Sequence, residues 1–287
     1  MDYPEIAKPR PSEMRVAPNL LGAERLTPNF SWSEVEKELG VVGQEGFNLA
    51  QLAIDRHCQS GLGDKLALLW EGKDGHRETY TFDQLRLLTN QFAHVLSCLG
   101  VRKGDRVFIF AGRVPELYVA VFGTLKYGAV IGPLFSAFGP DPVRERLADS
   151  GAKLLITTPE LRARIAVILK DLPQLQHIMI ISRDSKGAGL EKGDISYEQV
   201  MAAAPSHPPT IATTRDDYSI MHYTSGTTGK PKGAVHVHGA AIQHYATGRW
   251  ALDLHPDDLY WCTADPGWVT GTSYGMSAPW LNGVTQL

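Results

Sequence analysis

Apolar residues recur along the chain at two different spacings, and each spacing predicts one kind of element. Between Thr81 and Gly100 the apolar positions repeat every three or four residues, as on one face of a helix. Thr81 and Gln84 form a capping-box pattern at the start of this segment, and Gly100 closes it. Short apolar runs such as "DRVFIFA" are instead typical of buried strands.

Helical and strand patterns alternate over most of the chain after residue 46. The predicted helices cover residues 30–40, 48–58, 81–100, 115–128, 141–151, 159–170, 240–254 and 272–283. The predicted strands cover residues 65–71, 77–82, 105–111, 129–135, 153–158, 177–182, 218–224, 234–239, 258–264 and 283–287. The intervening segments 185–194, 205–217 and 265–271 are expected to be loops. Such alternation is typical of an α/β fold with parallel sheets covered by helices.

The same pattern divides the chain into two regions, an extended arm and an α/β domain. Residues 1–45 contain scattered prolines that forbid a long helix, and we expect an extended arm with one short helix capped by Ser31 or Ser33. Residues 46–287 form the expected α/β domain. Because the last residues, "GVTQL", resemble the middle of a strand, this domain is expected to be incomplete.

Composition and charge exclude several classes of protein. The net charge of −3 gives no electrostatic signature of nucleic-acid binding, so an anionic ligand must be held by local positive charge. No apolar stretch reaches the ~20 residues of a membrane span, and the charged N-terminus lacks a secretory h-region. The 3 cysteines are far apart, which indicates reduced, mostly buried thiols and a cytoplasmic location.

The most distinctive segment is "YTSGTTGKPKG", residues 223–233, which lies between two predicted strands. Its glycines allow close backbone approach, its hydroxyl groups are hydrogen-bond donors, and its lysines are positively charged. This set suits a polyphosphate. The phosphate-binding candidates are Thr224, Ser225, Gly226, Thr227, Thr228, Gly229 and Lys230, and the candidate catalytic residues are Lys230 and Lys232.

A phosphate loop of the P-loop NTPase type does not fit this segment. That motif requires a glycine five residues before the Gly-Lys pair, followed by Ser or Thr and a helix. Here Thr224 occupies the glycine position, Pro231 follows Lys230, and the next segment is strand-like. The hydroxyl that would bind the metal and the helix N-terminus are therefore both missing.

"YTSGTTGKPKG" resembles the signature of the adenylate-forming superfamily of acyl-CoA synthetases, luciferases and peptide-synthetase adenylation domains. "DLYWCTADPGWVTGTSYG", "DRVFIFAGRVPELYVAVFGTLKYGAVIGPLF" and "ITTPELRARI" are similar to segments of AMP-forming acetyl-CoA synthetases, and the resemblance covers nearly all residues after 28. It implies the large N-terminal domain of this fold. Motifs that the family carries further along, including its hinge and the lysine of its small C-terminal domain, do not occur before Leu287. The resemblance thus implies an N-terminal portion that is inactive alone.

The resemblance also implies an activity and its site. Members of this family join a carboxylate to ATP, release pyrophosphate, and then transfer the acyl group from AMP to coenzyme A; Mg²⁺ normally assists. Residues 224–232 would hold the β- and γ-phosphates of ATP. Trp268, Val269 and Thr270 match the segment that lines the acyl pocket and meets coenzyme A, and Arg162 and Arg164 match arginines that face its phosphates.

Other chemistry-bearing residues have simpler interpretations. His236, His238 and His244 lack acidic or cysteine partners at ligand spacing, so we expect strand packing and no metal site. Asp265 precedes Pro266 and is expected to cap a turn. Ser225 has no recognisable base and is not expected to be a nucleophile.

The sequence leaves other functions open beside acetate activation. One is a synthetase for propionate or another short acid. Another is a truncated, non-catalytic protein that binds nucleotide, and a third is a regulatory ATP-binding module. In each case the expected small molecules are ATP, coenzyme A and a short carboxylate, or ATP alone, with no nucleic acid and no membrane.

Overall fold

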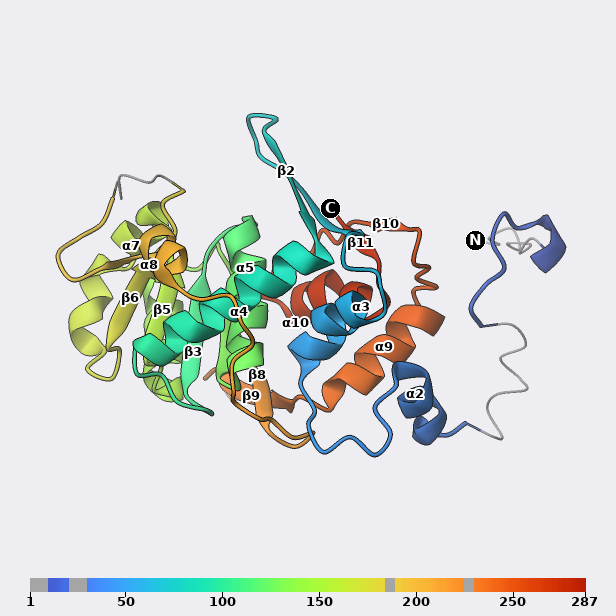
Figure 1. Cartoon of the computed structure of the whole chain (residues 1–287). Helices are drawn as coiled ribbons and strands as arrows, with labels where there is room; N and C mark the ends of the chain where they lie inside the picture. Colours follow the sequence, from blue (N-terminus) through green and yellow to red (C-terminus); the bar gives the residue numbers. More distant parts are fainter. Residues whose placement is uncertain (1–9, 21–29, 184–188, 225–229) are drawn as a thin grey trace, which may run out of the picture.

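The computed structural model describes residues 10–20, 30–183, 189–224 and 230–287, and these residues build two sheets with helices around them (Figure 1). The helices are η1 (Pro11–Glu13), α2 (Trp32–Leu39), η2 (Gln51–Asp55), α3 (Arg56–Gln59), α4 (Phe82–Cys98), α5 (Pro115–Tyr127), α6 (Pro140–Ser150), α7 (Pro159–Arg164), η3 (Ala166–Asp171), α8 (Tyr197–Ala203), α9 (Ala240–Trp250), α10 (Val269–Thr272), η4 (Ser273–Ser277) and α11 (Ala278–Leu281). The strands are β1 (Leu66–Glu71), β2 (Arg77–Thr81), β3 (Arg106–Phe110), β4 (Val130–Pro133), β5 (Leu154–Thr157), β6 (His177–Ile180), β7 (Ile195–Ser196), β8 (Tyr218–Thr224), β9 (Lys232–Val237), β10 (Leu259–Tyr260) and β11 (Thr285–Gln286).

The larger sheet has the order β7-β6-β5-β3-β4-β8-β9 and is parallel except for the antiparallel pair β8–β9. Side chains alternate between its two faces, as strand geometry requires. Val107 and Ile109 belong to the apolar cluster that includes α4 and α5, whereas Phe108 and Phe110 belong to the cluster that includes α6 and α7. Both faces of β3 are therefore covered, which explains why this strand is almost uniformly apolar.

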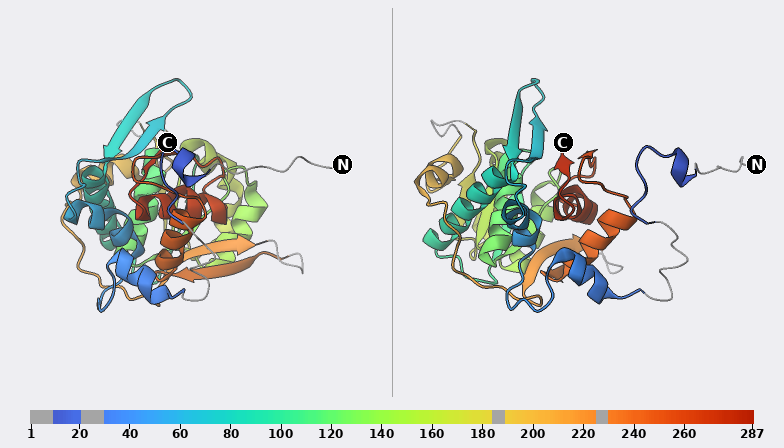
Figure 2. Two further views of the ribbon diagram at one scale, coloured as in Figure 1. Left: turned by 90° about the vertical axis from the view of Figure 1, so that its right-hand side faces the viewer. Right: turned by 45° about the vertical axis from the view of Figure 1, so that its right-hand side comes forward.

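The smaller sheet has the order β10-β11-β1-β2. Strands β1 and β2 form an antiparallel hairpin, and β11 pairs with β1 in parallel. Figure 2 shows this hairpin projecting from the rest of the molecule. The base of the hairpin is fixed to the core, because the buried Trp280 of α11 donates a hydrogen bond from Nε1 to Ala67 O at 2.9 Å.

The expected α/β architecture is confirmed, and the residues that end its elements act as their chemistry predicts. Ser31 caps α2, and Gly40 closes it in the left-handed region at φ 76°. Thr81 and Gln84 form both hydrogen bonds of a capping box at the start of α4. Although α2 lies in the expected arm, its Val35 and Leu39 are buried.

Several details differ from the expectation. The strand expected at residues 258–264 is only β10, Leu259–Tyr260, and the helix expected at 240–254 ends at Trp250. β7 and α8 were not predicted, because two strand residues and two helical turns give too short a pattern. The segment 159–170 is not one helix but α7 followed by the 3-10 turn η3. The helix expected from residue 272 begins three residues earlier, at Val269, so the loop is shorter. The thiols are not mostly buried, because Cys98 is exposed and Cys58 and Cys262 are half-buried.

A buried charge joins three helical segments on one side of the larger sheet. Lys126 in α5 is 1% exposed, and its Nζ lies 2.8 Å from Asp55 Oδ2 and 2.9 Å from Asn90 Oδ1. Burial lowers the pKa of Lys126, and the nearby carboxylate of Asp55 opposes that shift. The sequence pattern gave no sign of this group, because a lysine on an apolar helix is ordinarily expected to face solvent.

Replacement of Lys126 by Met is expected to lower the free energy of unfolding by about 3 kcal/mol, because it leaves the partly buried carboxylate of Asp55 without its partner. Chemical denaturation would measure the loss. A double variant that also carries Asp55→Leu should recover most of it. The matched control is Lys37→Met, which removes the exposed ion pair with Glu34 and should cost less than about 0.5 kcal/mol. Equal losses for the two single variants would contradict this interpretation.

Candidate active site

The predicted phosphate-binding segment joins two paired strands. β8 ends at Thr224, β9 begins at Lys232, and these two residues are partners in the antiparallel ladder. Their side chains therefore lie on the same face, and Thr224, Lys230 and Lys232 are all exposed. Lys232 belongs to a strand rather than to the loop itself, so its backbone is held directly opposite Thr224. Ser225, Gly226, Thr227, Thr228 and Gly229 lie outside the described residues.

A hollow of about 380 Å³ opens beside Thr224. It is lined by Pro133, Phe138, Arg146, His222, Tyr223, Thr224, Gly267, Trp268 and Val269. The structure thus brings together Thr224, Trp268 and Val269, which are predicted to hold the phosphates and the acyl group. Thr270 is exposed and is not among the lining residues.

The wall formed by Trp268 is held by a contact between two loops. Asp265 accepts hydrogen bonds from Gly267 N at 2.8 Å and from Ser136 Oγ at 2.6 Å, so it caps a turn as expected. The Trp268 and Phe135 rings lie with their centroids 5.4 Å apart. Gly267 approaches so closely that an added Cβ would lie 2.2 Å from Phe135 N. Only glycine fits there, and the contact fixes the position of Trp268.

A cation faces the hollow from α6. Arg146 is 9% exposed, and its guanidinium lies over the Phe138 ring at 4.4 Å and over the Tyr223 ring at 5.7 Å. Burial lowers the pKa of Arg146. Tyr223 donates a hydrogen bond from its hydroxyl to Asp149 Oδ2 at 2.7 Å, and burial together with this bond raises the pKa of Tyr223. These contacts join the last turns of α6 to the end of β8.

The opposite face of β8 carries a neutral histidine. The ring of His222 is buried, and its Nε2 lies 2.8 Å from the hydroxyl of Thr272 in α10. Burial, together with the nearby His236 and His244, lowers the pKa of His222 to about 4. The ring is therefore uncharged at neutral pH.

The two candidate arginines for coenzyme A have different surroundings. Arg164 donates hydrogen bonds from Nη1 to Ser136 O at 3.0 Å and to Phe138 O at 3.3 Å, so it supports the loop that contacts Trp268. Arg162 instead forms an ion pair with Asp194, with 3.3 Å between Nε and Oδ1. It lines a separate hollow of about 550 Å³ together with Lys192. Their contact with coenzyme A stays a prediction.

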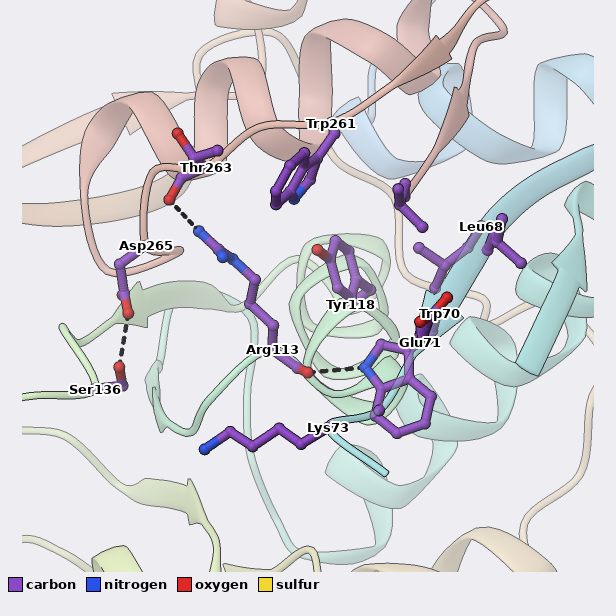
Figure 3. Close-up of a pocket in the computed structure, with 13 residues that line it drawn as sticks. Leu68, Trp70, Glu71, Lys73, Arg113, Tyr118, Ser136, Trp261, Thr263 and Asp265 are labelled. Atoms are coloured by element: carbon purple, nitrogen blue, oxygen red, sulfur yellow. Dashed lines mark hydrogen bonds between the residues drawn. The ribbon is translucent and has the colours of Figure 1, made fainter. Parts of the chain in front are cut away.

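A larger hollow of about 740 Å³ lies between the β1–β2 hairpin and α5 (Figure 3). Trp261 and Tyr118 project toward it, and Arg113 crosses its floor. Trp70 donates a hydrogen bond from Nε1 to Arg113 O at 2.9 Å, and the Arg113 guanidinium donates to the carbonyls of Thr263 and Ala264. Although this hollow is larger, the one beside Thr224 is the better candidate, because only there do the predicted residues meet.

No metal centre is found in the described part of the chain, where no group of three or more His, Cys, Asp or Glu side chains could hold an ion. His238 instead accepts a hydrogen bond at Nδ1 from Leu49 N at 3.1 Å, which is a packing role. No helix within the described ranges is long and apolar enough to cross a membrane.

Comparison with known proteins identifies the family of this chain. The model of the family described as "AMP-binding enzyme" matches residues 54–287. The chain belongs to this family. The acetyl-coenzyme A synthetase of Bacillus subtilis is 46% identical over 273 residues, which make up 94% of this chain and 46% of that protein. The acetyl-coenzyme A synthetase of Rubrobacter xylanophilus is 37% identical over 269 residues, or 89% and 41% of the two chains.

A solved structure agrees with this assignment to the AMP-binding enzymes. The crystal structure of an acyl-CoA synthetase from Brucella canis matches with a TM-score of 0.84 and 30% identity, over 93% of this chain and 47% of that one. The chain thus spans less than half of the length of these relatives.

Six of the nine lining residues were not among the predicted site residues: Pro133, Phe138, Arg146, His222, Tyr223 and Gly267. Strand alternation contains a signal for His222, because residues two apart on a strand share a face and Thr224, two residues later, is a predicted site residue. Arg146 and Phe138 carry no such signal. They reach the hollow only because α6 folds back over the sheet.

Replacement of Gly267 by Ala is expected to destabilise the protein by about 1–3 kcal/mol, because the added methyl group overlaps the backbone of residues 134 and 135. Thermal and chemical denaturation would measure the change. Gly112→Ala is the matched control, because no atom lies within 4 Å of its added Cβ. If Gly267→Ala were as stable as the control, the close approach would not be a constraint.

Acid is expected to weaken the folded state through buried histidines. Burial lowers the pKa values of His57, His222, His238 and His244 to about 4, below the ordinary value of 6.5. The unfolded chain then binds more protons than the folded one between pH 6.5 and 4, so stability present above pH 6.5 is lost as the pH falls. Each group contributes up to about 3 kcal/mol over this range.

Urea denaturation at pH 7.5, 6.0 and 5.0 would measure this dependence. His244→Gln removes one of the four groups, so the slope of stability against pH should become shallower. An unchanged slope in this variant would show that His244 does not titrate as expected.

Proposed function

We propose that the chain is part of an AMP-forming acetate–CoA ligase that acts in the cytoplasm. The observation that supports this most directly is the single hollow that Thr224, at the entry to the phosphate-binding segment, shares with Trp268 and Val269. ATP phosphates and a short acyl group need neighbouring sites, because they must react with each other. The likeness to acetyl-coenzyme A synthetases of Bacillus subtilis and Rubrobacter xylanophilus supports acetate as the acid.

The proposed reaction has two steps. In the first, a carboxylate oxygen of acetate attacks the α-phosphorus of ATP, the bond to the β-phosphate oxygen breaks, and pyrophosphate leaves. In the second, the thiolate of coenzyme A attacks the acetyl carbon, and AMP leaves with the former carboxylate oxygen. ATP enters as its magnesium complex, and the metal comes with this substrate.

The residues of the chain serve mainly to offset charge in the first step. An anionic carboxylate must approach an anionic phosphate chain, which is unfavourable without fixed positive charge. Lys230 and Lys232 supply two ammonium groups next to Thr224, and Ser225, Thr227 and Thr228 supply hydroxyl donors. Gly226 and Gly229 let the backbone approach the phosphates. Trp268 and Val269 line the acyl pocket, while Thr270, Arg162 and Arg164 face coenzyme A.

The remaining residues of a complete site are proposed to lie in a longer polypeptide. The support is that the chain spans only 46% of the Bacillus subtilis relative. Sequencing of the DNA downstream of the codon for Leu287 would test this: an open reading frame should continue. A stop codon at that place would favour the alternative of a non-catalytic nucleotide-binding remnant.

In that longer protein, Lys230→Ala and Lys232→Ala are each expected to lower ATP–pyrophosphate exchange on the order of 10²-fold, because each removes a charge that stabilises the reacting phosphates. Exchange should be measured with acetate, propionate and butyrate as separate substrates. Acetate is expected to give the fastest rate, whereas a faster rate with propionate would favour the synthetase for a longer acid. Lys37→Ala, on the exposed face of α2, is the control.

Two outcomes would contradict the proposal. The wild-type protein might bind ATP but exchange no pyrophosphate with any short acid, which would favour a regulatory ATP-binding module. Alternatively, the lysine variants could exchange as fast as the control variant. Cell fractionation would test the cytoplasmic location.

A further inference from the structure

Strand β8 has a different partner on each face at the point where it enters the phosphate-binding segment. Tyr223 faces α6, where its hydroxyl donates to Asp149. His222 faces α10, where its Nε2 meets the hydroxyl of Thr272 at 2.8 Å. The second contact reaches the residues that directly follow Trp268, because α10 begins at Val269.

The His222 contact is fully enclosed. His222 is 3% exposed and Thr272 is 1% exposed, so water does not compete for their hydrogen bond. The Thr272 hydroxyl also lies 3.2 Å from Trp268 O and 3.2 Å from Val269 O. The Thr272 hydroxyl therefore links the His222 imidazole with the backbone carbonyls of Trp268 and Val269, which line the pocket.

The direction of these hydrogen bonds follows from counting donors. Both carbonyls can only accept, so the Thr272 proton goes to one of them, and the imidazole donates its Nε2–H to the hydroxyl oxygen. Nδ1 is then an acceptor, and it has no partner among the described residues. The opposite arrangement would leave a buried N–H without an acceptor, which is the rarer defect in folded proteins.

We propose that His222 and Thr272 are a positioning pair that couples the phosphate-binding segment to the acyl pocket. A displacement of Thr224 when ATP binds is transmitted over two residues of β8 to His222, through the Thr272 hydroxyl, and on to the backbone of Trp268 and Val269. The pocket thereby reaches its final shape only when the nucleotide is in place. This inference rests on the proposed function, and neither residue needs to touch a reacting atom.

The variant that isolates the contact is Thr272→Val, which removes the hydroxyl and keeps the shape of the side chain. In the whole protein, it should lower the exchange rate with acetate about 10-fold and raise the KM for acetate, with a smaller effect on the KM for ATP. The preference for acetate over propionate should fall several-fold, because the wall is no longer fixed by bound nucleotide. Thr272→Ser keeps the hydroxyl and should restore both the rate and the preference.

Two controls separate positioning from stability alone. Thr89→Val removes another buried hydroxyl, whose hydrogen bond goes to Leu85 O within α4, and should change neither the rate nor the preference. Asp149→Ala removes the acceptor of the Tyr223 hydroxyl on the other face of β8 without changing a lining residue of the hollow, and should not alter the preference between acids. A merely structural role of Thr272 would lower the rate equally for all acids.

Hydrogen exchange followed by mass spectrometry gives a readout that needs no variant. In the wild-type protein, a non-hydrolysable ATP analogue should slow exchange in the peptide covering residues 266–272 as well as in the one covering 218–224. In Thr272→Val, the analogue should protect only residues 218–224. The same protection of residues 266–272 in the variant, together with an unchanged acid preference, would overturn the inference while leaving the proposed function intact. A wild-type protein that exchanges no pyrophosphate would instead overturn the proposed function, and the inference with it.

Discussion

The pairing of Thr224 with Lys232 is the constraint on which the candidate site depends. If both ends of residues 223–232 were free, binding of a polyphosphate would have to order the whole segment. Each residue ordered on binding costs conformational entropy. The antiparallel partner strand removes that freedom at both ends of the segment. β8 also pairs in parallel with β4 through Ile131 and Ile220, so the segment is anchored to the larger sheet and its core.

The hollow beside Thr224 is lined by residues from three parts of the fold. The sheet supplies the end of β8, α6 supplies Arg146, and the loop before α10 supplies Trp268. The loop before α10 is held against the loop after β4 by the Asp265–Ser136 hydrogen bond and by the close approach at Gly267. These two contacts therefore restrict the movement of the loop that carries Trp268.

Sequence alone could predict most elements of the larger sheet, because buried parallel strands and amphipathic helices such as α4 give strong periodic patterns. It could also predict the phosphate-binding segment and Trp268, because local motifs carry them. It could not predict β7 and α8, which are short, or the buried charge of Lys126, which depends on Asp55 and Asn90 from other helices. The contacts of His222 and Arg146 likewise exist only once β8, α6 and α10 are assembled.

The alternation of side chains along β8 has a consequence for the length of this strand. Ile220 and His222 point to one side of the sheet, and Met221 and Tyr223 pack on the other. Loss or gain of one residue between Tyr218 and Thr224 would exchange these sides, leaving an imidazole against α6 and a phenol against α10. A single-residue insertion or deletion in this strand is therefore expected to disturb both faces of the sheet at once, whereas a substitution changes only one.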